Sequence, residues 1–268
     1  MKNFGRLFAL LALMAACSSN DDPSLQGTSK VVLDFSTDLT YGKQSKAGET
    51  RSVDLTPYQN VNNYTVQLIK DGTVVKEGIY GNMALEEEID PGTYTFKAFY
   101  GDNAVPAAWD ALYVEGAQTF AAQSGRTATV QFTCVPANAK MKVVYSDDFS
   151  LYYSDCTIGV TTTYQTTPFV ITKADAEAGK EAYFKVDAGE NTFSLTFDLK
   201  DKQGLSVTPA DFGVQTVKVS PRDFLTLTVK PNIISIEGGK INGIQVSVDN
   251  GLTEEPVSVV IPDEYVQE

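Results

Sequence analysis

Histidine is absent from the 268 residues of the chain. Nucleophilic sites of the Ser-His-Asp and Cys-His kinds need an imidazole base, so the sequence excludes both. Zinc sites that use histidine are excluded as well, and the two cysteines other than Cys17 are too few for a site made only of thiolates. The sequence also has no glycine-rich phosphate loop and no metal-binding motif.

Paired carboxylates and Ser-Lys pairs are the enzyme chemistry that remains open. Glu86, Glu87 and Glu88 are a consecutive acidic run, but in a strand their side chains would point to alternating faces. Glycosidases hold their two carboxylates a few ångströms apart, and sequence spacing shows no such pair. We therefore expect a non-enzymatic chain with no catalytic residues, metal or cofactor.

A short apolar run, residues 8–14, lies at the start of the chain behind two basic residues. A membrane-spanning helix needs about 20 apolar residues, so this run is typical of a signal peptide instead. The small residues Ala15 and Ala16 then precede Cys17, which resembles a bacterial lipobox. The sequence predicts a lipoprotein signal over residues 1–16 and a lipid on Cys17. The alternative is an ordinary secretory signal that ends near a cysteine.

Residues 17–29 are expected to form the lipidated N-terminus and a polar linker that holds the body off the membrane. The lipid attaches the chain firmly, because each buried methylene contributes about 0.8 kcal/mol and a lipoprotein carries more than one acyl chain. Ser18 after the cysteine resembles outer-membrane sorting, and Asp21 and Asp22 resemble surface-export signals of Gram-negative gut anaerobes. We expect an outer-membrane protein at the cell surface, with the membrane as a partner.

Basic residues are scarce, since 21 Lys and Arg stand against 34 Asp and Glu and give a net charge of −13. Removal of Lys2 and Arg6 with the signal takes the net charge to −15. Nucleic-acid binders need a positive footprint, so nucleic acid is excluded as a partner. The charge favours neutral glycans or other proteins.

Alternation of apolar and polar residues with a period of two is the dominant pattern, and it predicts strands with one buried face. The segments that carry it are 64–68, 94–98, 127–134, 139–145, 193–199, 225–230 and 244–249. Turn signals such as Asp71 and Gly72 separate them, and only residues 173–179 look helical. Many short antiparallel strands predict an all-β fold of the β-sandwich kind.

A domain boundary is expected near Pro136, with about seven strand candidates before it and about eight after it. The halves, residues 30–136 and 137–268, each have the usual size of a domain. Only three residues separate the predicted strands 127–135 and 139–145, so we expect two sandwiches held end to end with limited swing. One large continuous sandwich is the alternative.

Cys134 and Cys156 remain after lipidation, and an exported protein permits a disulfide between them. The favoured interpretation is that both are small buried hydrophobic residues. Cys134 continues an inward-facing row of its predicted strand, which suits a core thiol.

A series of loose strand-and-turn motifs lies between residues 64 and 139: 64–72, 90–98, 109–116, Phe120, 127–134 and 136–139. Their order resembles a domain-of-unknown-function lipoprotein family of gut anaerobes, which is similar in architecture to the fimbrillins, the subunits and anchors of lipoprotein-derived pili. The resemblance that they carry extends over most of the mature chain. The resemblance implies two tandem transthyretin-like or Ig-like antiparallel β-sandwich domains. It also implies a structural or adhesive role, with other surface or pilus proteins as partners.

Fimbrillin stalk subunits are cut after an arginine in the loop behind the first strand, and the freed groove then accepts a strand from a neighbouring subunit. The resemblance makes Arg51 the candidate processing site, in the polar stretch that follows the expected first strand 30–35. Residues 257–261 are the candidate donated strand. The alternative is an uncut, solvated loop and a last strand that pairs within its own domain.

Four aromatic residues near predicted strand ends or loops are candidates for stacking on sugar rings: Trp109, Tyr113, Tyr152 and Tyr153. The alternative is that these rings fill the ends of the sandwich cores. The leading functional hypothesis is a fimbrillin-like, non-catalytic structural or adhesion component of the cell surface. The second hypothesis is a surface glycan-binding lipoprotein for nutrient capture.

Overall fold

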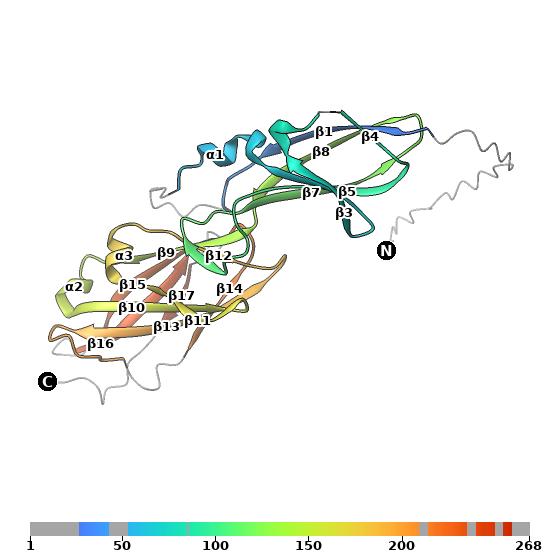
Figure 1. Ribbon diagram of the computed structural model, residues 1–268. Coiled ribbons are helices and arrows are strands. Elements are labelled where there is room, and N and C mark those ends of the chain that lie inside the picture. Colours follow the sequence, from blue (N-terminus) through green and yellow to red (C-terminus); the bar gives the residue numbers. More distant parts are fainter. Residues whose placement is uncertain are drawn as a thin grey trace, which may run out of the picture.

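The computed structural model describes residues 27–42, 53–84, 86–208, 214–234, 240–249 and 254–258. Cys17 and Arg51 lie outside these residues, so the predictions made for them stay predictions. Within the described ranges, no helix is long and apolar enough to cross a membrane. The fold is all-β, as the alternation predicts, and its strands lie in two bodies arranged end to end (Figure 1).

The N-terminal half contains a seven-stranded sheet with the strand order β3-β2-β5-β7-β8-β1-β4. Its strands are β1 (Ser29–Thr37), β2 (Thr65–Lys70), β3 (Thr73–Ile79), β4 (Glu86–Ile89), β5 (Gly92–Tyr100), β7 (Val114–Ala122) and β8 (Thr127–Pro136). Strands β7 and β8 pair only at one end, through Val114 with Pro136 and Glu115 with Val135. The sheet therefore opens into two layers, β8-β1-β4 and β3-β2-β5-β7, which enclose the core.

The two end strands of this sheet lie close together, as the ion pair between Lys76 in β3 and Glu87 in β4 shows. Glu87 is half-buried, whereas Glu86 and Glu88 are exposed. The acidic run thus alternates between faces, as the sequence predicts for a strand.

Strand β1 lies inside the sheet, parallel to β8 and antiparallel to β4. Its alternate residues Val31, Leu33 and Phe35 are buried, and they pack with side chains of β2, β5 and β8 in one hydrophobic cluster. The ring of Phe35 stacks on that of Phe132 at a centroid distance of 5.5 Å. The first described strand is therefore a full member of the core.

The C-terminal half consists of two packed sheets, with the strand orders β11-β10-β13-β14 and β17-β16-β15-β9-β12-β6. Most of its strands are β9 (Asn138–Tyr145), β10 (Tyr153–Thr162), β11 (Gln165–Ile171), β12 (Ala182–Lys185), β13 (Asn191–Asp201), β14 (Gln215–Val219), β15 (Phe224–Ile234), β16 (Lys240–Asp249) and β17 (Glu254–Ser258). Strand β6 (Ala107–Trp109) comes from the N-terminal half of the sequence and pairs with β12. A second hydrophobic cluster fills the space between these two sheets.

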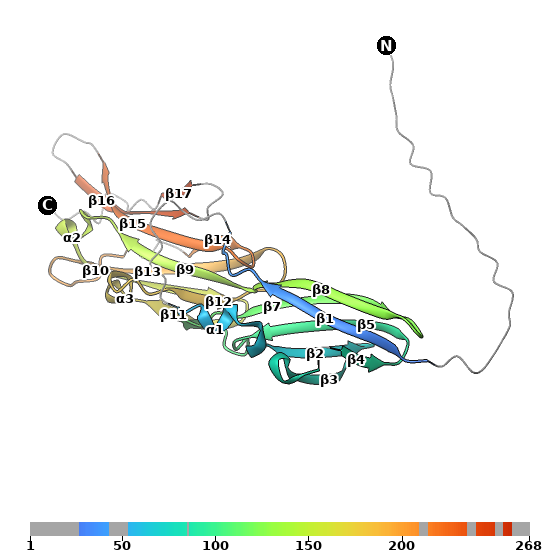
Figure 2. The ribbon, with the colours of Figure 1, turned by 90° about the horizontal axis from the view of Figure 1, so that it is seen from above.

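The division of the chain at residues 136 and 137 remains our proposal. The two clusters follow it closely, but each half also contributes to the other. Trp109 packs against the C-terminal cluster, and Tyr183 of β12 is buried in the N-terminal cluster. Figure 2 shows the resulting elongated arrangement from above.

Helices in the described residues are short: α1 (Thr56–Gln59), α2 (Phe149–Tyr152) and α3 (Lys173–Glu177), with the 3-10 turns η1 (Val61–Asn63) and η2 (Tyr80–Asn82). Helix α3 confirms the one helical prediction, and a capping box between Thr172 and Asp175 begins it. The hairpin predicted at Asp71 and Gly72 is also confirmed. Both residues have positive φ, 51° and 76°, which the tight turn between β2 and β3 requires.

Cys134 and Cys156 are buried free thiols that lie in different clusters, so the favoured interpretation is confirmed. Burial raises the pKa of each thiol to about 12. Because the thiolate is the reactive form, both side chains should be inert while the protein stays folded.

We expect iodoacetamide to leave both thiols unmodified at about pH 8 in the lipid-free body that begins at Ser18, and to modify both after unfolding in denaturant. Mass spectrometry of the alkylated protein measures this directly. Rapid modification of Cys134 or Cys156 under native conditions would show that the cluster around it opens.

Candidate functional site

The clearest convergence of charged and polar side chains lies where the two halves meet. Lys140 of β9 and Glu181, just before β12, form a buried ion pair with side-chain N–O distances of 3.2 and 3.3 Å. Lys140 is 8% exposed and Glu181 is 2% exposed. Taking two charges out of water is costly, so a buried pair persists only with close geometry and further partners.

Those further partners come from both halves of the chain. The Lys140 ammonium lies 3.8 Å from the ring centroid of Phe224 and 4.9 Å from that of Tyr41. The Tyr183 hydroxyl donates a hydrogen bond to Glu181 at 3.4 Å. Strand β9 is buried on both faces here, because Tyr41 from the N-terminal half covers the face that carries Lys140.

Asn138 links the same region to two further segments. Its side-chain amide donates to the Ala111 carbonyl at 2.9 Å, and its amide oxygen accepts from the Tyr41 hydroxyl at 2.8 Å. Asn138 begins β9, and only one residue separates it from the end of β8 at Pro136, so these bonds fix the chain at the point where a hinge would have to bend.

Arg222 holds the segment that leaves β1. Its guanidinium donates to Asp38 at 2.8 Å and to the Thr40 carbonyl at 2.9 Å, and its own carbonyl accepts from the Gly42 amide at 2.7 Å. Hydrogen bonds from Thr40, together with Arg222, hold the pKa of the Asp38 carboxyl below its usual value. Arg222 has a φ of 69°, a strained conformation that these contacts stabilise.

Strand β6 completes the connection, because it adds residues of the N-terminal half to the six-stranded sheet. The amide of Lys185 donates to the Pro106 carbonyl at 2.9 Å, and the amide of Asp110 donates to the Glu181 carbonyl at 3.3 Å. We call the contacts of Lys140, Glu181, Asn138 and Arg222, together with strand β6, the junction. They hold the two halves in one relative orientation.

The structure separates the four aromatic candidates for glycan stacking. Tyr113 and Tyr153 are only 6% and 7% exposed, so their faces cannot stack on a sugar. For these two the alternative holds: their rings pack inside the molecule, because each lies on an inward-facing position. Tyr152 is half-buried against the C-terminal cluster. Trp109 is also half-buried, with its ring edge-to-face on Phe169 at 4.9 Å and Lys180 over it at 5.3 Å.

The last described strand pairs within its own chain. Strand β17 runs antiparallel to β16, with Gln245 opposite Ser258 and Asp249 opposite Glu254, and forms the edge of the six-stranded sheet. The predicted donated strand, residues 257–261, thus begins inside an intramolecular pair, and its last three residues lie outside the described ranges.

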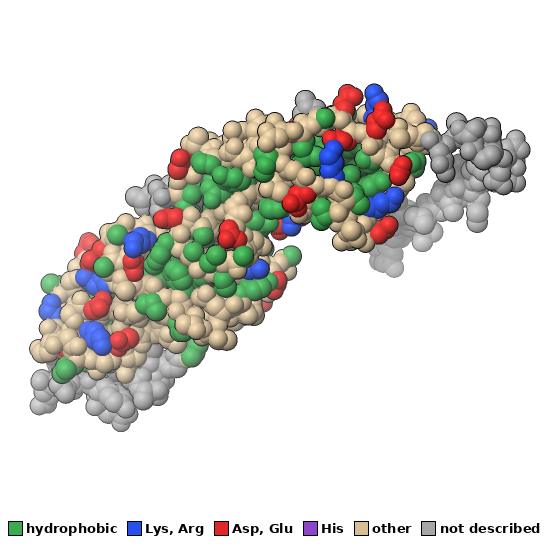
Figure 3. Space-filling view, viewed as in Figure 1, with side chains coloured by type: hydrophobic (Ala, Val, Ile, Leu, Met, Phe, Trp, Pro, Cys, Tyr) green, Lys and Arg blue, Asp and Glu red, His purple; other side chains and the backbone are tan. Residues whose placement is uncertain are grey.

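Charged side chains are interspersed on the face that Figure 3 shows, with Lys and Arg scattered singly or in small groups beside Asp and Glu. Among the described residues, no group of three or more Cys, Asp or Glu side chains could hold a metal ion.

A family model of a domain of unknown function, DUF4493, matches residues 31–263. The chain belongs to this family. The match covers most of the DUF4493 chain and confirms the resemblance to a family of unknown function. No curated protein matches its sequence.

Two of the solved structures that resemble this chain are fimbrial proteins. The fimbrial anchor protein Mfa2 from Porphyromonas gingivalis is 11% identical, with a TM-score of 0.42 over 87% of this chain and 99% of that one. A fimbrial assembly protein from Parabacteroides distasonis is 10% identical, with a TM-score of 0.41 over 87% of this chain and 99% of that one. Both TM-scores are low, so these likenesses leave the function of the DUF4493 chain open.

We expect Lys140→Met to lower the free energy of unfolding by about 3–5 kcal/mol, because it leaves the Glu181 carboxylate buried without its cation. Urea denaturation followed by circular dichroism measures the loss. The matched control is Lys218→Met, which breaks the exposed ion pair with Glu190 and should cost about 0–1 kcal/mol. Adding Glu181→Leu to Lys140→Met should recover much of the loss. Equal losses of unfolding free energy for Lys140→Met and for Lys218→Met would refute a tightly packed junction.

Alkaline pH should weaken the junction through its tyrosines. Burial raises the pKa of Tyr41 and of Tyr183 well above the usual value, so the folded state keeps both phenols neutral while the unfolded state ionises near pH 10. The stabilisation is complete below about pH 10 and is lost as pH rises above it. We expect Tyr41→Phe to reduce the slope of unfolding free energy against pH between about pH 10 and 11. Identical slopes in the wild type and the variant would contradict burial of Tyr41.

Proposed function

We propose that this chain is a lipid-anchored, non-catalytic adhesion component of the cell surface, of the anchor or accessory kind of fimbrillin-like protein. The observation that carries the proposal is the position of β1. This strand directly follows the predicted lipid-bearing linker, and it lies in the core of the N-terminal half. The tether thus enters the molecule through a strand that is bonded on both sides.

The geometry of β1 suits a tether under load. The strand begins at the pole of the N-terminal half farthest from the C-terminal half and runs toward the junction (Figures 1 and 2). It pairs with β8 from Lys30 to Thr37 and with β4 from Ser29 to Val32. A pull on the linker acts along the strand and loads these cross-strand hydrogen bonds together, so none of them bears the force alone.

The segment that leaves β1 is held by contacts with the C-terminal half. Residues 38–42 are bonded to Arg222, and the Tyr41 ring covers Lys140. A cut at Arg51 would therefore leave β1 attached through its sheet pairing and through these contacts. This favours a protein that keeps its first strand over a stalk subunit that exchanges it.

Limited trypsin treatment of the lipid-free body from Ser18 tests the proposal. We expect only monomers on SDS gels, without a resistant ladder, whether or not mass spectrometry finds a cut at Arg51. The Arg51→Ala variant assigns the cut, and Arg222→Ala, which removes the clamp on Thr40, should increase loss of the fragment that contains β1. An SDS-resistant ladder from the wild type together with release of that fragment would establish strand exchange and overturn the anchor assignment.

A further inference from the structure

The hairpin between β10 and β11 contains an irregularity that the adhesion role does not use. Thr162 lies opposite Gln165, whereas Val160 lies opposite Phe169. The one residue Thr161 therefore faces the three residues 166–168 of β11, which form a wide bulge. Such bulges re-aim side chains and are frequent next to functional sites.

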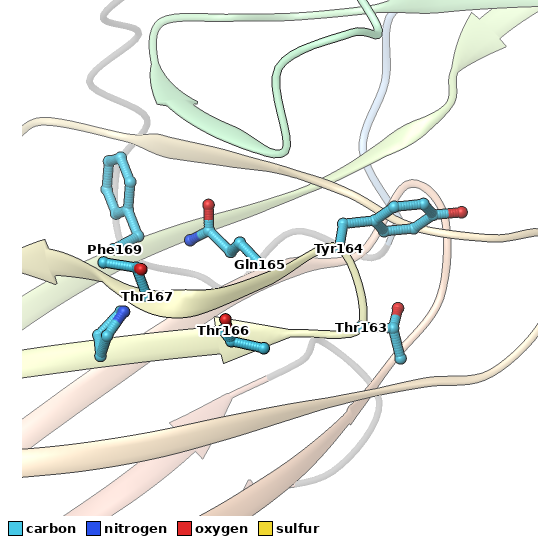
Figure 4. A pocket seen from close by; sticks show the side chains of 7 residues that line it. Thr163, Tyr164, Gln165, Thr166, Thr167 and Phe169 are labelled. Atoms are coloured by element: carbon cyan, nitrogen blue, oxygen red, sulfur yellow. The ribbon is translucent and has the colours of Figure 1, made fainter.

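The bulge opens a hollow of about 490 Å³ lined by Thr163, Tyr164, Gln165, Thr166, Thr167, Pro168 and Phe169 (Figure 4). Sites for small ligands usually measure about 300–1,000 Å³. Gln165 and Phe169 point to the same side of β11 in this view, and Tyr164 points away from them. A single short segment thus supplies hydroxyl groups, an amide and two aromatic rings.

Gln165 gives the most direct evidence for a ligand. Its side-chain Nε2 is buried and has no hydrogen-bond partner among the described residues. A buried donor without a partner destabilises the folded state, so its retention needs a reason outside the folding of the hairpin. A rotation of the Gln165 side chain toward the hollow would let an acceptor oxygen of a ligand satisfy this donor.

The aromatic rings on either side of Gln165 are held in place. The Tyr164 hydroxyl donates to Asp187, and the Lys185 ammonium lies 4.8 Å from the centroid of the Tyr164 ring. The Phe169 ring packs on Trp109 and, at 5.5 Å, on Phe184. Fixed rings next to hydroxyl groups suit ligands that have both C–H faces and hydroxyl groups.

The chemistry of the lining defines the ligand class. None of the seven lining residues is charged, and three are threonines, whose hydroxyls both donate and accept hydrogen bonds. Pro168 lacks a backbone N–H, and the bulge interrupts the ladder, so the free edge of β11 is a poor template for another strand. We propose that the bulged β10–β11 hairpin is a binding site for a neutral saccharide.

Isothermal titration of the lipid-free body from Ser18 with neutral oligosaccharides tests this site. The probes are maltohexaose, cellohexaose, xylohexaose, mannopentaose and N-acetyllactosamine, each at up to about 10 mM, so that dissociation constants in the millimolar range can be measured. We expect at least one probe to bind. We expect Gln165→Leu to weaken that binding about tenfold or more, because a bonded amide is lost. Thr166→Val, which removes only a hydroxyl, should weaken it less.

Two controls separate binding from folding. Gln165→Leu removes a buried unsatisfied donor, so its melting temperature should be unchanged or higher, and Thr166→Val covers the case in which the first variant does not fold. Gln67→Leu removes an exposed amide of β2 in the other half and should bind as the wild type does. Absence of binding to every probe, or affinities unchanged in both pocket variants, would overturn the assignment. Neither result affects the proposal about β1.

Discussion

The buried ion pair of Lys140 and Glu181 lies between the two halves of the chain, and the arrangement of the whole molecule depends on it. A buried pair of this kind is weak evidence for stability, since apolar residues of similar volume often serve as well. It does demand specific partners, and here Tyr41, Tyr183 and Phe224 provide them from both halves. We infer that the pair fixes how the halves meet.

The fixed junction connects the two proposals for this chain. Strand β1 runs to the junction from the pole that would carry the proposed lipid anchor, and Arg222 holds its exit, so a load on that anchor would be passed into the C-terminal half. The hollow of the β10–β11 hairpin lies in that half, and its Phe169 packs on Trp109 of the strand that crosses between the halves. A saccharide bound there would be held at a set distance from the membrane.

The sequence predicts the strands well wherever one face is buried and the other is wet. The alternation at 94–98 and 193–199 is that of β5 and β13, and the predicted helical segment 173–179 contains helix α3. The alternation does not predict strand β6, because three residues are too few to show a period of two. Its partner, β12, follows it by more than seventy residues, so no local pattern joins them.

The sequence reveals neither the junction nor the hollow, and the reason is the same for both. Lys140 reads as an ordinary exposed lysine of a strand, and only the fold places Tyr41 and Glu181 around it. Gln165 likewise reads as a polar hairpin residue until the bulge buries its amide. Tyr113 and Tyr153 do lie near strand ends, as the sequence predicts, but only the fold shows that both are buried there, which is the alternative interpretation of these rings.

Trp109 provides the most direct test of a fixed junction, because the sequence contains one tryptophan and it lies in β6. Denaturant unfolding of the lipid-free body would be followed by the fluorescence of Trp109 and by far-ultraviolet circular dichroism, which reports both halves. If the halves form one unit, the two signals change in a single coincident transition. A fluorescence change at a lower denaturant concentration, with the circular dichroism of the strands unchanged, would show that the junction opens by itself. That result would contradict a fixed junction.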